Sequence, residues 1–457
     1  MDTFNFEWKP EYKGTWQSPS FEDEMWGTLK VGQSDIILEL ICHSCHEIEG
    51  SHLESITGRI DSLDANNVLS VMLRNLSLVK MKVSLGEGYN SYKYVAEELF
   101  ISSEIGTLPL PIKAVRFCSE YIGLWSKGYT KDHIIESFDE HRVNLDYTQP
   151  EPYRCFEDDS ICVELCYSFG RKTPNHLGYT LRTRNYLDVT FKEPSVDFHT
   201  AKTRALQTSY LFSLLIQRPI DFCDIFYITD RGTFIHRNGL RYRNVIIRET
   251  PYTSNNFADL TSDNLCSMVP KWHLYYQKYT NSLDTFFEIW NHELLPSEQR
   301  FKGYMSVLDG LTSDLPVENN GQTKDSKRVR SINEILLKVS SQESGLSKNE
   351  INTLKMAALR ESSDSVEMRF CELLNILNGI LPDRIDNEYV YMCARTRNKL
   401  THPESEYEED IFTPSQYPKV VRDLETILCS YMLHCIGLEK VLIKQTLRLN
   451  AHETVTL

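Results

Sequence analysis

The sequence predicts an α+β multidomain protein, in which a mainly-β, sandwich-like N-terminal domain is followed by an all-α helical bundle. Three observations lead to this prediction. The chain has 457 residues, which is too long for one ordinary hydrophobic core. Aromatic residues make up 11% of the chain, which favours a sizeable β component. Apolar residues are spaced as in strands up to about residue 265 and as in helices beyond it.

The first part of the chain, residues 1–265, is predicted to consist mainly of short strands. Runs of strand-forming residues alternate with turn residues, at a spacing near that of a sandwich or a curved sheet. One segment departs from this pattern, because apolar residues recur at helical spacing from about Thr200 to Leu215, and Pro219 ends that helix. The strand-forming runs cover residues 27–31, 36–42, 68–73, 94–101, 161–167, 187–191 and 245–248.

The second part of the chain is predicted to be helical. Apolar residues from Trp272 to Trp290 follow a period of 3.6, and a second helix is expected over 298–311. Residues 312–326 are polar and rich in turn formers, which indicates an exposed loop. We therefore assign 1–265 to a β-rich domain, 266–311 to connecting helices and 312–457 to a helical domain. The further helices are expected at 329–339, from near 347, from near 365, at 387–401 and at 414–442.

Charge and composition narrow the class of protein. The formal net charge of −15 argues against a protein that coats nucleic acid non-specifically, although a small local basic site remains compatible with it. No run of 18 or more apolar residues occurs, and the N-terminal residues do not follow the signal-peptide pattern. We therefore expect a cytoplasmic protein whose 12 cysteines are mostly free thiols. No nucleotide-binding glycine loop, G-x-S-x-G turn or H-E-x-x-H motif is present.

The motif that carries chemistry lies at the end of the helix predicted over 387–401. Pro403 disfavours helical geometry at the preceding residue, so this helix should end at His402. Arg397 and His402 are five residues apart, about 140° around a helix, so they can flank one cleft but do not stack on each other. A basic last turn followed by His-Pro is also a common way to end a helix, so a purely structural role remains open.

The run Arg397-Asn-Lys-Leu-Thr-His402 resembles the Arg-x4-6-His signature of the HEPN superfamily, in its frequent Arg-Asn form. Arg395 also fits the looser spacing, and the adjoining Asn398 favours Arg397. The whole chain is similar to ApeA-type antiphage defence proteins, which join a large, mainly-β N-terminal domain to a C-terminal HEPN domain. Its N-terminal cue is residues 26–40, a Gly-initiated strand, a turn and an alternating strand.

This resemblance implies a metal-independent endoribonuclease that acts in antiphage defence (abortive infection) by cutting host or phage RNA, such as tRNA or mRNA. No cofactor is expected for catalysis. A histidine of near-neutral pKa can accept or donate a proton at the 2′-hydroxyl or the 5′-oxygen, which is the role of His402. A guanidinium can stabilise charge on the scissile phosphate, which is the role of Arg397. Asn398 would orient His402 or the phosphate. The expected products carry 2′,3′-cyclic phosphate and 5′-hydroxyl ends.

The resemblance also implies partners. HEPN ribonucleases pair two such domains, so we expect a homodimer or a higher even-numbered homo-oligomer. The β-rich domain would sense a trigger, such as a phage protein, or restrain the helical domain. The alternative is a non-catalytic HEPN module for dimerisation or RNA binding, with a β domain that binds a partner. A nucleotidylyltransferase-controlled toxin is a third possibility, against which the large N-terminal domain argues.

One cysteine pair has the spacing of a metal site. Cys42, Cys45 and His46 form a C-x2-C-H run of the kind found in structural zinc sites. A second ligand pair would have to come from Cys155, Cys162 and Cys166 or from His52, and no second C-x2-C occurs in the chain. The sequence is therefore compatible both with a structural zinc site and with ordinary buried thiols.

Overall fold

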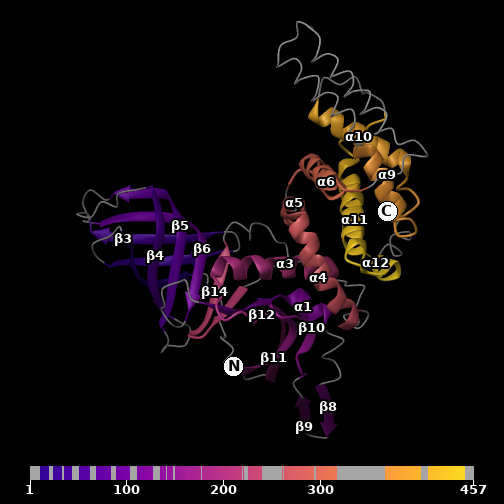
Figure 1. Cartoon of the computed structure of the whole chain (residues 1–457). Coiled ribbons are helices and arrows are strands. Elements are labelled where there is room, and N and C mark those ends of the chain that lie inside the picture. The colour runs from indigo at the N-terminus through magenta and orange to yellow at the C-terminus, as the bar shows by residue number, and fades with distance from the viewer. Residues whose placement is uncertain are drawn as a thin grey trace. The chain divides into compact units, whose positions relative to one another are not determined.

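The computed structural model divides into two compact units, mainly between Tyr276 and Gln277 (Figure 1). The first unit also includes residues 291–294 and 436–438, so the predicted connecting segment 266–311 is shared between the two. Among the described helices, none has the length and apolar character needed to cross a membrane. The structure describes residues 11–19, 24–32, 35–43, 51–61, 68–83, 89–102, 111–126, 134–139, 142–147, 150–175, 178–218, 220, 225–238, 260, 262–292, 295–315, 366–402 and 410–447.

Twelve described strands of the first unit form one continuous antiparallel sheet, in the order β10-β11-β12-β7-β13-β14-β6-β3-β2-β1-β4-β5. A separate hairpin joins β8 (Ile134–Asp139) to β9 (Arg142–Tyr147). The strands of the large sheet are β1 (Glu11–Gln17), β2 (Met25–Val31), β3 (Ile36–His43), β4 (His52–Asp61), β5 (Val68–Val83), β6 (Tyr89–Ser102), β7 (Ile112–Cys118), β10 (Tyr153–Glu157), β11 (Ile161–Asn175), β12 (Gly178–Phe191), β13 (Ile225–Thr229) and β14 (Gly232–Asn238).

Strands β1 to β6 close into a six-stranded barrel. Closure requires two non-local pairings, β1 with β4 and β3 with β6. Strand β1 also pairs with β2, and β6 also pairs with β5, its neighbours along the chain. The end of β6 also pairs with β14 and so joins the barrel to the remaining strands. The α+β class predicted from the sequence is therefore confirmed, but the sandwich-like arrangement is not. The sheet closes on itself because β6 pairs with β3 along one edge and with β5 along the other, and its 14 residues also leave room for β14.

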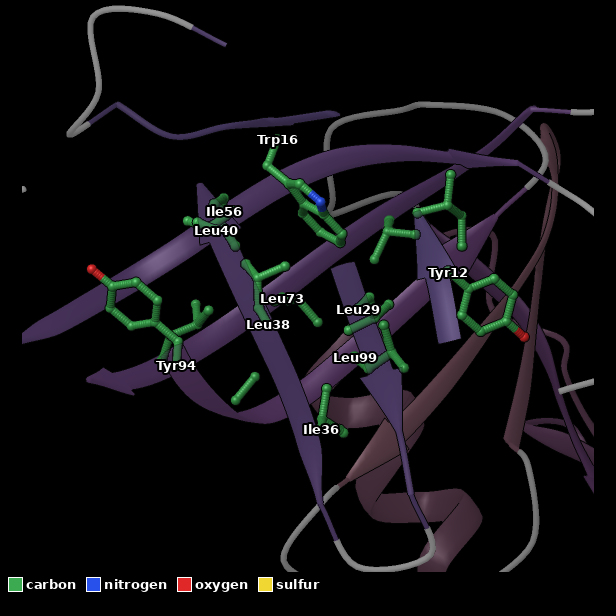
Figure 2. Close-up of a cluster of buried hydrophobic side chains, with 14 of the residues drawn as sticks. Tyr12, Trp16, Leu29, Ile36, Leu38, Leu40, Ile56, Leu73, Tyr94 and Leu99 are labelled. Carbon is green, nitrogen blue, oxygen red and sulfur yellow. The ribbon is translucent and has the colours of Figure 1, made fainter. Parts of the chain in front are cut away.

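The barrel interior is built from alternating side chains. In β1, Tyr12 and Trp16 are buried, whereas Lys13 between them is exposed. Trp16 has no exposed surface and lies among aliphatic side chains of the other barrel strands (Figure 2). A Cβ atom added at Gly58 would lie 2.5 Å from the Trp16 ring, so only glycine fits at this position of β4. The strand alternation therefore sets which residues face inward, and one glycine makes room for the indole.

The described helices of the first unit are α1 (Glu120–Trp125), α3 (Phe198–Ile216) and α4 (Ser262–Lys278). Helix α3 confirms the helix expected over 200–215. Its N-cap is Asp197, whose carboxylate accepts a hydrogen bond from the backbone N–H of Thr200, and it ends at Gln217 in a left-handed conformation. The Trp272 indole of α4 donates to the carbonyl oxygen of Gln207 over 2.6 Å, which ties α4 to α3.

All the regular secondary structure described in the second unit is helical. Its helices are α5 (Thr280–Asn291), α6 (Ser297–Leu311), α9 (Val366–Ile376), α10 (Asn387–Thr401), α11 (Tyr417–Cys435) and α12 (Lys440–Leu447). Helix α6 packs against α9, α10 and α11. The long helix expected over 414–442 divides at Gly437, whose φ of 91° lies in the left-handed region. The helices expected at 329–339 and from 347, and the strand at 245–248, lie outside the described residues.

A half-buried carboxylate joins three helices of this unit. Glu425 of α11 accepts hydrogen bonds from the Trp290 indole of α5 over 2.8 Å and from Arg300 of α6 over 3.2 Å. The Tyr304 hydroxyl donates to the same carboxylate over 3.3 Å. These contacts fix α5 and α6 against α11. Helix α6 also packs against α10, the helix that carries the predicted motif.

Candidate functional site

Helix α10, which carries the predicted motif, follows from local sequence signals. Its N-cap is Asp386, whose side chain accepts a hydrogen bond from the backbone N–H of Tyr389 over 2.9 Å. Its C-cap is His402, which leaves the helical region with φ −129° and ψ 82°, as expected for a residue that precedes proline. The predicted helix over 387–401 is confirmed at both ends.

The buried face of α10 differs in part from the predicted one. The sequence pattern placed Tyr389, Met392, Cys393, Thr396 and Leu400 on the buried stripe. In the structure Cys393 and Thr396 are buried, and Tyr389, Met392 and Leu400 are only half-buried. Val390 is the buried residue that the pattern missed, because helix packing turns the face by about one residue. Burial raises the pKa of the Cys393 thiol, which is therefore neutral.

His402 and Asn398 lie on the accessible end of the helix. Both residues are exposed, and the His402 backbone N–H donates to the Asn398 carbonyl oxygen over 2.8 Å. This bond closes the last turn of α10 and fixes the point from which the imidazole extends. The sequence prediction that His402 ends the helix is correct.

Arg397 belongs to an ion-pair cluster that the sequence did not predict. Its Nη2 lies 3.5 Å from Oδ2 of Asp309 on α6, and the Arg369 guanidinium of α9 binds Oδ1 of the same carboxylate. The Arg397 side chain is 34% exposed and the Arg369 side chain 17%. Two guanidinium groups from two helices thus share one carboxylate, which leaves an excess of positive charge next to the end of α10.

Arg395, the other arginine that fits the motif spacing, is held differently. Its guanidinium carbon lies 4.1 Å from the centroid of the Tyr391 ring, and its Nη1 lies 3.0 Å from Oδ2 of Asp410. The Arg395 side chain is therefore engaged on two sides, by stacking and by an ion pair. The Arg397 ion pair is longer, at 3.5 Å, and the Arg397 side chain is more exposed than that of Arg395, 34% against 25%.

Asp309 and Arg369 are the residues of this cluster that reasoning from the sequence missed. They lie 88 and 28 positions before Arg397 in the numbering, and neither belongs to a recognisable motif. Asp309 falls in the helix predicted over 298–311, and Arg369 in the helix expected from near 365. The helices were predictable, but their packing partners were not, because the contact between them depends on the fold of the whole unit.

The zinc prediction concerns residues that are mostly outside the described ranges. Cys45 and His46 lie there, and Cys42 is described only by its backbone in β3. Cys155, Cys162 and Cys166 are buried, and this burial raises the pKa of all three thiols, that of Cys162 to about 11. Within the described ranges, no group of three or more His, Cys, Asp or Glu side chains is arranged to hold a metal ion.

Comparisons of the chain with protein-family models, with curated proteins and with solved structures give no significant match. The candidate site therefore stands on its own residues and geometry.

Proposed function

We propose that the helical unit is a metal-independent endoribonuclease of the HEPN type, with Arg397 and His402 at its centre and Asn398 beside them. One observation carries the proposal. An exposed histidine at the C-terminal end of α10 follows, by five residues, an arginine whose side chain is one-third exposed and, among the described residues, lies 3.5 Å from Asp309 in an ion pair. The all-helical character of the described part of this unit supports the same proposal.

The chemistry follows from the two residue types. RNA supplies its own nucleophile, the 2′-hydroxyl, which attacks the adjacent phosphorus while the bond from phosphorus to the 5′-oxygen breaks. An imidazole takes the proton from the 2′-hydroxyl or gives one to the departing 5′-oxygen. The Arg397 guanidinium binds the non-bridging phosphate oxygens as their charge grows. The products are a 2′,3′-cyclic phosphate and a 5′-hydroxyl.

One histidine cannot serve as both base and acid in the same step. A second copy of the site would supply the other group, so the proposal includes a homodimer or a higher even-numbered assembly. We further propose that the activity serves antiphage defence as an abortive response, with the β-rich unit as the sensor of a trigger such as a phage protein. Host or phage RNA, including tRNA, is the substrate class.

The test compares Arg397→Ala and His402→Ala with matched controls. Arg395→Ala removes the neighbouring arginine, and His434→Ala removes another histidine from the last turn of a helix, α11. Plaquing of phage, integrity of total RNA and the chemical ends of the fragments are measured for each variant, after circular dichroism has shown that it folds. We expect loss of cleavage and protection for Arg397→Ala and His402→Ala only, and cleavage by wild type in the presence of EDTA.

The outcome also separates the two main candidate functions. If Arg397→Ala and His402→Ala fold and still cleave RNA like wild type, the catalytic assignment is wrong. The helical unit is then better described as a dimerisation or RNA-binding module.

A further inference from the structure

We infer that Asp309 is an internal competitor for the Arg397 guanidinium, and that Arg369 is a positioning residue that limits this competition. The inference rests on the proposed function, because it assigns a regulating contact to the phosphate-binding arginine of that site. The Asp309 carboxylate holds one guanidinium at each of its oxygens.

The carboxylate presents the same acceptors as the proposed substrate. A phosphodiester offers two non-bridging oxygens to a guanidinium, and a carboxylate offers two oxygens of similar charge. Asp309 therefore lies 3.5 Å from one nitrogen of the Arg397 guanidinium, where an oxygen of a scissile phosphate could otherwise bind. An RNA phosphate must draw the Arg397 guanidinium away from Asp309, or share it.

The two ion pairs are unequal. The Arg369 side chain is about half as exposed as that of Arg397, and its contact with Asp309 is the closer of the two. Water screens the more exposed pair more strongly. Arg369 is consequently the more strongly bound partner of Asp309, and Arg397 is the partner that a ligand can draw away.

This inequality gives Arg369 a function that does not require it to touch RNA. By neutralising Asp309, it weakens the hold of this carboxylate on Arg397. Without Arg369, the full negative charge of Asp309 would face Arg397 alone, and the guanidinium would be less available to a phosphate. Removing the charge of Asp309 at the same time should reverse that loss.

The experiment is a double-mutant cycle in the full-length chain. The variants are Arg369→Ala, Asp309→Asn, the double variant and Arg397→Ala. Two readouts are used: cleavage of an RNA oligonucleotide, and binding of the same sequence with 2′-O-methyl groups, which cannot be cleaved, followed by fluorescence anisotropy. Arg384→Ala is the matched control, because Arg384 pairs with Asp423 in the same unit and its side chain is 51% exposed.

We expect Arg369→Ala to lower both affinity and cleavage by about tenfold, the size expected when a hydrogen bond to a charged group changes. The double variant should recover to within about threefold of wild type on the same scale. Asp309→Asn alone should bind the oligonucleotide at least as tightly as wild type, and Arg384→Ala should change neither readout.

Three results would overturn the inference in distinguishable ways. If Arg369→Ala binds and cleaves like wild type, Asp309 does not compete. If Arg369→Ala loses function and the double variant does not recover, Arg369 acts by direct contact or through the fold. If Arg397→Ala itself changes neither readout, the proposed function fails, and the inference about Asp309 and Arg369 fails with it.

Discussion

The hydroxyl of Thr396 offers the sharpest test of how the end of α10 is built. Thr396 is 1% exposed, and its Oγ1 donates to the Met392 carbonyl oxygen over 2.7 Å. The same oxygen accepts a hydrogen bond from the backbone N–H of Phe412 over 2.9 Å. One hydroxyl thus ties the segment that leads into α11 to the helix that carries Arg397 and His402.

The substitution Thr396→Val keeps the shape of the side chain and removes both bonds. It leaves the buried Phe412 N–H without its acceptor, a desolvation cost of about 1–3 kcal/mol. Thr401→Val is the matched control, because Thr401 is exposed and its hydroxyl only donates to the Arg397 carbonyl oxygen within the helix. We expect Thr401→Val to change the free energy of unfolding by less than about 0.5 kcal/mol.

Hydrogen exchange measured by mass spectrometry on peptides that contain Phe412 is the suitable assay, because it follows protection in the segment where the bond is lost. The expected cost corresponds to a loss of protection of roughly fivefold to a hundredfold in Thr396→Val. Equal protection in Thr396→Val and Thr401→Val would refute the reasoning, since the buried bond to Phe412 would then contribute nothing.

Three further predictions concern other parts of the fold. Gly58→Ala should destabilise the barrel by about 1–3 kcal/mol, because its Cβ would meet the Trp16 ring, and thermal melts should show no such loss for Gly123→Ala, whose added Cβ meets nothing within 4 Å. Glu425→Gln should lower the free energy of unfolding by about 1–3 kcal/mol in urea titrations, because it removes the charged acceptor of three donors. A urea titration curve unchanged from wild type would contradict this. The hydrogen bond from His236, together with the charge of Lys202, lowers the pKa of Glu98 from 4.5 to about 2. The ionised carboxylate therefore stabilises the fold above pH 4.5, and this stabilisation is lost as the pH falls towards 2. Glu98→Gln should therefore be less stable than wild type by at most about 3 kcal/mol at neutral pH, and a difference that persists unchanged at pH 2 would refute the assignment.

Several features of the candidate site could be predicted from the sequence because they depend on neighbouring residues. The limits of α10 follow from Asp386 as its N-cap and from Pro403 after its last residue. The exposed position of His402 follows from the end of the helix.

Other features of the site depended on contacts between distant segments. The sequence offers both Arg395 and Arg397 at the motif spacing, and the structure shows Arg395 in contact with Tyr391 and Asp410 and Arg397 in contact with Asp309. Val390 proved to be buried where Tyr389 was expected, because the direction in which α10 packs depends on its neighbours. A helix period gives the width of an apolar stripe more reliably than its centre.

The sequence by itself determined the division into a β-rich and a helical part, the ends of α3 and α10, and the arginine-histidine motif, because hydrophobic period, caps and proline act within a few residues. The tertiary structure alone decided that β1 pairs with β4 and β3 with β6 to close a barrel, and that Arg369 and Arg397 meet at Asp309. These contacts join residues tens of positions apart. Their formation depends on the loop entropy and the packing of a whole unit, which no local pattern encodes.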